Sequence, residues 1–258
     1  MASRPRVVLI GESPLLQEYA ALCLSKGYDV HARLNSDSAD LGVPKGTKKV
    51  AKPTKAFSIA FELTNTNPEL KRKNIIELDR LLGPKAIILS SSLVVTVAEQ
   101  ASWVSRPERL VGIGAFPTML DGGLIELATS SATDEATLTT AKDFVKALGK
   151  ESAVVQDSIG MVMPRVLCML INEACFAMME GVAAGKDIDT AMKLGTNYPS
   201  GPVEWGKRIG FTQVEAVLSA LHHSFGEDRY RVAPLLRQMA FRRKSNHKEH
   251  RVRKEELK

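Results

Sequence analysis

The sequence predicts an α/β protein with a doubly wound parallel sheet in residues 1–156, followed by an all-helical domain in residues 157–240. Two observations carry this prediction. Short apolar runs alternate with segments of helical periodicity up to about residue 156, as in a parallel sheet whose strands are joined by crossover helices. From residue 157 onward only helical periodicity remains. The last residues, 241–258, read as a basic tail.

The first elements form one compact pattern. Residues 6–10 contain the short apolar run Val7–Ile10, typical of a buried strand, and residues 15–26 carry apolar side chains at helical spacing before Gly27 ends the helix. A second strand is expected at 29–33. Strand, turn, helix and strand within roughly 30 residues form the unit that opens a parallel sheet.

The lysine-rich stretch 35–55 holds two prolines, so we expect a loop there. Runs of apolar strand formers and of helical periodicity then alternate. They predict a strand at 57–62, a helix at 68–82, a strand at 86–89, a helix at 96–104, strands at 110–113 and 124–127, a helix at 134–148 and a strand at 152–156. The helical domain begins with a long apolar helix at 161–182.

Composition narrows the class of protein. The chain has 258 residues, of which 44% are hydrophobic and 25% charged, so it can bury a sizeable core. The apolar run at 7–10 is too short for a signal-peptide core, and no stretch approaches the roughly 18 apolar residues of a membrane span. The three cysteines form no CxxC pair, which argues against structural zinc and suits a reducing compartment. We therefore expect a cytoplasmic protein with no metal site.

The net charge of +6 resides mainly in the tail. Residues 241–258 hold eight Lys or Arg and three Glu, so the body before them is nearly neutral. We expect no nucleic-acid binding by the folded body, because binding of that kind needs a basic patch on it. For the tail, a solvated end and an acidic partner are both open interpretations.

The loop after the first strand departs from a known pattern. Rossmann-type domains that bind a dinucleotide carry G-x-G-x-x-G here, for a tight turn, close approach of the pyrophosphate and helix packing. This chain retains only Gly11, because Ser13 and Leu16 replace the other two glycines, and Glu12 adds a negative charge where the pyrophosphate would lie. We expect NAD binding to be weakened or lost, with a competent NAD site as the alternative.

The end of the second strand also lacks the usual acidic residue that binds the adenosine ribose, since the chain has Arg33 and Leu34 there. Arg33 would suit a 2′-phosphate instead. NAD and NADP both remain open at this point.

Several further stretches together resemble the 3-hydroxyacyl-CoA dehydrogenase family, and its 3-hydroxybutyryl-CoA dehydrogenases in particular. They are Asn65–Lys71, Ser90–Leu93, Arg106–Gly112, Asp157–Gly160, Asn172–Ala174, Asp187–Gly195 and Tyr198–Pro202. The resemblance implies a Rossmann-type domain and a helical dimerisation domain. It also implies an NAD-linked oxidoreductase of fatty acid metabolism, acting on an (S)-3-hydroxyacyl-CoA.

In the family a histidine, oriented by a glutamate, removes the hydroxyl proton during hydride transfer to NAD. By resemblance the glutamate is Glu126, but the histidine position is Gly114. Ser91 matches the family's substrate-contacting serine, and Lys71 matches a basic position that we assign to the cofactor site together with Gly11, Ser13, Leu16 and Arg33. Without a histidine, Glu126 is open to interpretation as a relic, and Ser91 as a residue that only satisfies local backbone groups.

Three hypotheses follow. The chain is a family member with little or no dehydrogenase activity, a catalytically inactive dimeric binding or scaffolding pseudoenzyme, or an enzyme with a displaced base. An acyl-CoA is the expected substrate or ligand. We expect a homodimer through 157–240, because the long helix at 161–182 is apolar on nearly every face.

Overall fold

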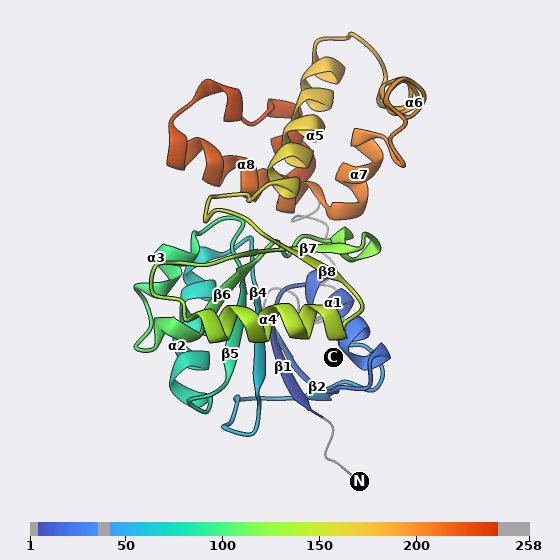
Figure 1. Cartoon of the computed structure of the whole chain (residues 1–258). Helices are drawn as coiled ribbons and strands as arrows, with labels where there is room; N and C mark the ends of the chain where they lie inside the picture. The colour runs from blue at the N-terminus through green and yellow to red at the C-terminus, as the bar shows by residue number, and fades with distance from the viewer. Residues whose placement is uncertain (1–4, 36–41, 242–258) are drawn as a thin grey trace, which may run out of the picture. The chain divides into compact units, whose positions relative to one another are not determined.

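The computed structural model describes residues 5–35 and 42–241. The chain divides into two compact units, the first ending at Val162 and the second beginning at Met163. Figure 1 shows the sheet of the first unit and the helices of the second. The predicted basic tail, 241–258, lies outside the described residues except for its first position.

An eight-stranded sheet organises the first unit, with the order β3-β2-β1-β4-β5-β6-β7-β8. The strands are β1 (Arg6–Gly11), β2 (Asp29–Leu34), β3 (Lys48–Lys49), β4 (Ile59–Leu63), β5 (Ile87–Ser91), β6 (Leu110–Ile113), β7 (Leu124–Ala128) and β8 (Glu151–Val154). Neighbouring strands are parallel except for β6 and β7. The predicted fold class, a Rossmann-type sheet followed by helices, is confirmed.

Two details of the sheet differ from the prediction. The expected loop at 35–55 contains β3, a two-residue strand that extends the edge beside β2. Strand β7 runs antiparallel to β6 because the connection between them holds only the short 3₁₀ helix Met119–Asp121 and no crossover helix.

Helices cover both faces of this sheet. Helices α1 (Leu15–Ser25) and α4 (Glu135–Ala147) share one hydrophobic cluster with the sheet. Phe61 of β4 lies between them, with ring centroids 5.1 Å from Tyr19 and 5.7 Å from Phe144. Side chains alternate along a strand, so the next residue, Glu62, points to the opposite face, where it pairs with Lys71 of α2. Figure 1 shows α4 running across the sheet.

Helices α2 (Pro68–Leu81) and α3 (Val97–Ala101) complete the first unit, with the 3₁₀ helix Pro107–Arg109 before β6. The Asn67 side chain caps α2 by accepting the Leu70 N–H at 3.0 Å, and Pro68 occupies the first helical position, where its missing N–H costs little.

Residues 157–162 belong to the first unit, although the sequence predicts the boundary before Asp157. The Asp157 carboxylate accepts the N–H groups of Val97 and Ala98 at 2.8 Å and so caps α3. The Gly160 N–H donates to the Leu93 carbonyl at 2.9 Å. These bonds attach the segment to the carboxyl edge of the sheet, so the chain leaves the first unit only at residue 163.

The second unit is helical throughout its described part. It contains α5 (Met163–Met179), α6 (Gly185–Thr196), α7 (Pro202–Ile209), α8 (Phe211–Phe225), the 3₁₀ helix Asp228–Tyr230 and a helical segment at 234–241. Helix α5 is shorter than the predicted 161–182, because Gly181 adopts a positive φ of 74° and closes its carboxyl end. None of the helices in the described part of the chain is both long and apolar enough to span a bilayer.

Two polar side chains hold the second unit together. Asn172 of α5 donates to the Arg231 carbonyl at 2.9 Å and accepts the Ala233 N–H at 2.8 Å. Asp189 of α6 accepts the N–H groups of Val203 and Glu204 at the start of α7. Gly201 lies so close that a Cβ atom there would be 2.2 Å from the Asp189 carboxylate, so this turn requires glycine.

Candidate functional site

The carboxyl edge of the sheet is the candidate site of the first unit. In open sheets of this type a ligand binds outside the carboxyl ends of the strands, where the strand order reverses. That reversal falls between β1 and β4, which are neighbours in the sheet. The loops after β1 and β4 therefore border the crevice in which a dinucleotide would lie.

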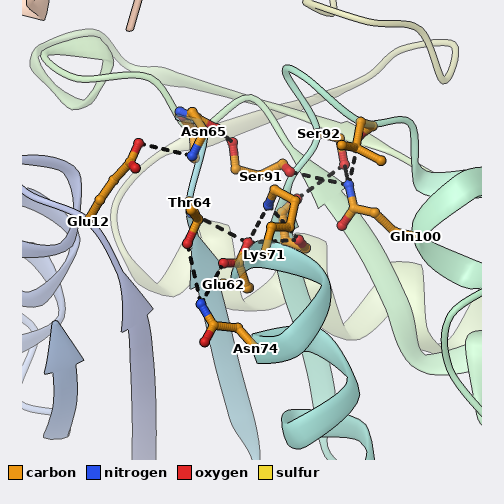
Figure 2. A network of polar contacts seen from close by, with 12 residues as sticks. Glu12, Glu62, Thr64, Asn65, Lys71, Asn74, Ser91, Ser92 and Gln100 are labelled. Carbon is orange, nitrogen blue, oxygen red and sulfur yellow. Dashed lines mark hydrogen bonds and ion pairs between the residues drawn. The ribbon is translucent and has the colours of Figure 1, made fainter. Parts of the chain in front are cut away.

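Glu12 follows β1 directly and points across this crevice. Its Oε1 accepts the Asn65 N–H at 2.9 Å and the Thr66 N–H at 3.2 Å. Its Oε2 accepts the Thr66 hydroxyl at 2.6 Å. Figure 2 shows the side chain reaching from the end of β1 toward Asn65. Glu12 is 5% exposed, so the carboxylate is buried between the two loops.

The rest of the predicted phosphate loop packs inward. Gly11 must be glycine, since a Cβ atom there would lie 2.5 Å from the Leu63 carbonyl oxygen of β4. Leu16 is fully buried in the hydrophobic core under α1. Ser13 precedes Pro14, which has no N–H and so removes one donor from the loop.

The Arg33 guanidinium is held by the Glu77 carboxylate and by the Ala51 carbonyl. It donates to the two carboxylate oxygens of Glu77 at 2.9 and 2.5 Å, and to the Ala51 carbonyl at 2.8 Å. A bidentate arginine–carboxylate pair is a strong, fixed geometry. Arg33 therefore lies at the sequence-predicted strand end but serves to join β2 to α2.

Lys71 lies beneath the edge of the sheet. Its ammonium group forms an ion pair with Glu62, and both side chains are 0% exposed. The Ser90 hydroxyl lies 3.3 Å from the same Nζ atom, and Asn74 donates to the other Glu62 oxygen at 3.2 Å. This network, drawn in Figure 2, is closed to solvent in the described structure.

Ser91 ends β5 and faces the loop after β4. Its hydroxyl donates to the Asn65 side-chain oxygen at 2.5 Å and contacts the Ala115 carbonyl at 3.2 Å. Asn65 in turn donates to the Ala115 carbonyl at 3.0 Å. Ser91 is fully buried. Its hydroxyl links the end of β5 to the loops that follow β4 and β6.

Glu126 and Gly114 are adjacent across β6 and β7. The Gly114 N–H donates to the Glu126 carbonyl at 2.9 Å, and a Cβ atom at position 114 would lie 3.6 Å from Glu126 Oε2. The same Oε2 accepts the Val162 N–H at 3.0 Å. The Met161 sulfur would lie 3.4 Å from that Cβ atom. The carboxylate thus holds the segment that leads out of the first unit.

Histidines of the described chain occur in both units. In the first unit, His31 lies on β2, which four strands separate from β7 and Glu126, and it contacts Asp29 and the Phe57 ring. His222 and His223 are exposed on α8 of the second unit. Within the described residues, no three His, Cys, Asp or Glu side chains gather as a metal site would require.

Gly11, Ser91 and Glu126 thus lie along the carboxyl edge, each with its own neighbours, while Arg33 and Lys71 are held by acidic partners. Sequence reasoning missed the contact of Glu12 with Asn65 and Thr66. Thr66 donates to Glu12 from 54 positions along the chain, so no local pattern marks this contact.

Comparison with known proteins identifies the family. The model of the 3-hydroxyacyl-CoA dehydrogenase NAD binding domain matches residues 44–158, and the model of the family's C-terminal domain matches residues 160–252. The chain belongs to the 3-hydroxyacyl-CoA dehydrogenase family. The first match begins after the phosphate loop, 11–16.

Individual members of the family agree. The 3-hydroxybutyryl-CoA dehydrogenase of Bradyrhizobium diazoefficiens is 36% identical over 178 residues, which is 69% of this chain and 61% of that protein. The probable 3-hydroxybutyryl-CoA dehydrogenase of Bacillus subtilis is 34% identical over 69% of this chain and 62% of its own length. The alignments thus span less than two thirds of these relatives. The crystal structure of (S)-3-hydroxybutyryl-CoA dehydrogenase from Ralstonia eutropha superposes with a TM-score of 0.74 at 28% identity, covering 92% of this chain and 93% of that one.

Proposed function

We propose that this member of the family keeps the fold and an acyl-CoA-binding role but has little or no NAD-linked dehydrogenase activity on (S)-3-hydroxyacyl-CoA. The observation that carries the proposal is Gly114 beside Glu126. The family's histidine position has no side chain here, and the carboxylate that would orient it is bound to the Val162 N–H.

Oxidation of the substrate hydroxyl needs a group to take its proton. A lone carboxylate is a weak base for an alcohol, because the proton affinities of the two differ widely. Glu126 is also 6% exposed and bound to backbone, which limits its contact with a substrate. The missing imidazole is therefore not replaced by Glu126.

The residues around the crevice do not fit NAD well. A dinucleotide needs a glycine-rich loop with free N–H groups and an acidic ribose partner. Here Pro14 supplies no N–H, and Glu12 places a carboxylate between the loops. Arg33 is held by Glu77, which also argues against a role in binding the 2′-phosphate of NADP. We propose that binding of NAD is weakened or lost.

The family residues that remain in the second unit are those that hold its fold. Asn172, Asp189 and Gly201 make the contacts that join α5, α6 and α7 to their neighbours. The second unit thus keeps its fold without the general base, as a binding or scaffolding protein requires.

We propose a homodimer formed within 157–240. A groove of about 690 Å³ runs along α5 and the 3₁₀ helix Asp228–Tyr230. Its lining includes the apolar side chains Val166, Met169, Leu170 and Phe176, the cations Arg165, Arg229 and Arg231, and the anions Glu173, Glu180 and Asp228. Apolar area with balanced charges suits a self-complementary interface, in which one patch meets its own copy.

We propose that the protein resides in the cytoplasm. Cys23, Cys168 and Cys175 are buried free thiols, which fits the reducing cytoplasm.

The test is reduction of acetoacetyl-CoA by NADH at high protein concentration, with calorimetric titration of acetoacetyl-CoA in parallel. We expect binding of the acyl-CoA with turnover below about 10⁻³ s⁻¹, far under ordinary enzyme rates. A Glu126→Gln variant is the matched control, since any residual turnover should not depend on that carboxylate. Turnover near 1 s⁻¹ that falls in the Glu126→Gln protein would overturn the proposal and establish a displaced-base enzyme.

A further inference from the structure

The Glu12 carboxylate joins the two loops that border the crevice between β1 and β4. Its own backbone N–H also donates to the Leu63 carbonyl at 3.0 Å, so main chain and side chain are both tied to the end of β4. The bridge crosses the place where the strand order reverses, which is where an open sheet binds its ligand.

The groups that donate hydrogen bonds to the Glu12 carboxylate form an anion site. Two successive backbone N–H groups, of Asn65 and Thr66, and the Thr66 hydroxyl converge on its two oxygens. Successive N–H groups aimed at one point are the usual cradle for a phosphate or carboxylate. The site also lies just before the amino terminus of α2, a helix of 14 residues, whose dipole adds to the positive potential.

The occupant of this site is already present within the chain. Glu12 is buried at 5% exposure and satisfies donors that would otherwise face an incoming anion. Thr66 favours this arrangement, because its hydroxyl donates to the carboxylate, whereas an acidic side chain at position 66 would repel it.

We propose that Glu12 is a built-in occupant of the dinucleotide crevice, and that its carboxylate keeps the phosphates of a dinucleotide out of this crevice by filling the Asn65–Thr66 anion site. This inference rests on the proposed function, in which NAD binding is weakened. It goes beyond charge repulsion, because it assigns the exclusion to one seated side chain that a single substitution can remove.

The experiment titrates NADH and inorganic pyrophosphate into the full chain and three variants. Glu12→Ala vacates the site, so NADH should bind at least tenfold more tightly than to the wild-type chain. Glu12→Gln removes the charge but keeps an oxygen for the backbone N–H groups, so its gain should be smaller, about threefold. If repulsion alone operated, the two variants would gain equally.

Asp157→Asn is the matched control. Asp157 also accepts two successive backbone N–H groups, at the start of α3, but outside the crevice between β1 and β4. The Asp157→Asn protein should bind NADH with the same affinity as the wild-type chain. Millimolar pyrophosphate should raise the melting temperature of Glu12→Ala and leave that of the wild-type chain unchanged, because a ligand stabilises only a protein that binds it.

Equal NADH affinity in the wild-type chain, Glu12→Ala and Glu12→Gln would overturn the inference, and so would an equal gain in Asp157→Asn. An equal gain in Glu12→Ala and Glu12→Gln would also overturn the inference, because repulsion alone gives that result. If Glu12→Ala does not fold, an absence of any gain in Glu12→Gln still contradicts an occupied site. The wild-type dissociation constant tests the proposed weakness of NAD binding, whereas the variant-to-wild-type ratio tests the role of Glu12, so the two can fail separately.

Discussion

Gly114 and Glu126 face each other across β6 and β7, with the Gly114 N–H bonded to the Glu126 carbonyl at 2.9 Å and the Glu126 carboxylate bonded to the Val162 N–H at 3.0 Å. A side chain at position 114 would start 3.2 Å from the Glu126 Cβ atom and 3.4 Å from the Met161 sulfur. The Glu126 carboxylate therefore has the Val162 backbone as a partner, and position 114 offers it no side chain.

Replacing Gly114→His should not restore appreciable turnover. A general base contributes about 10²–10⁴-fold only when hydride donor and substrate are held in reacting geometry. The new side chain would also press against Met161, so Gly114→His combined with Met161→Ala should fold better than the single variant. The measurement is NADH oxidation with acetoacetyl-CoA, and a rate of about 1 s⁻¹ or more for Gly114→His alone would show that the cofactor site is intact.

Lys71→Met should destabilise the first unit by about 3–5 kcal/mol, because it leaves the buried Glu62 carboxylate without its cation. Glu62→Gln combined with Lys71→Met should recover part of this loss, since no uncompensated charge remains. Urea unfolding of the wild-type chain and both variants measures the difference. If Lys71→Met kept full stability and lost NADH affinity, Lys71 would instead be a cofactor contact, as the sequence resemblance implies.

Apolar periodicity was sufficient to predict the central strands and their order of appearance. Strand β3 could not be predicted in this way, because Lys48 and Lys49 pair with β2 through their backbones and carry no strand-forming side chains. The pattern within β7 likewise holds no information on its direction. The short connection from β6 fixes that direction, and the crossover helix α4 then makes β8 parallel to β7.

The candidate site was predictable only in part. The resemblance supplied Glu126 and the missing histidine at Gly114, and the structure brings the two positions together. The contact of Glu12 with Thr66 joins residues 54 positions apart and depends on β1 lying beside β4. Local sequence cannot supply such a pairing, so Glu12 could be interpreted only as a charge near the phosphate loop.

All three cysteines should resist alkylation in the folded protein. Burial raises the pKa of the Cys23 thiol to about 12 and that of Cys175 to about 11, and it also raises the pKa of Cys168. At pH 8 a thiol of pKa 11 is only about a thousandth thiolate, the reactive form. Titration with a thiol-reactive chromophore should find full reaction in urea and almost none without it. Rapid modification of one thiol in the native protein would contradict this burial.

Val166→Asp should convert the proposed homodimer into a monomer. Val166 lines the groove along α5 and is 53% exposed in the isolated chain, so it is available to meet a second copy. In an interface formed by the same patch on both subunits, one substitution places two carboxylates in apolar surroundings, where an unpaired charge is costly.

Leu194→Asp is the matched control, because Leu194 is also exposed and apolar but lies on α6 and is not part of the groove lining. Light scattering after size-exclusion chromatography should give a dimer for the wild-type chain and Leu194→Asp, and a monomer for Val166→Asp with an unchanged circular dichroism spectrum. A wild-type monomer at working concentration, or a Val166→Asp protein that remains dimeric, would refute this placement of the interface.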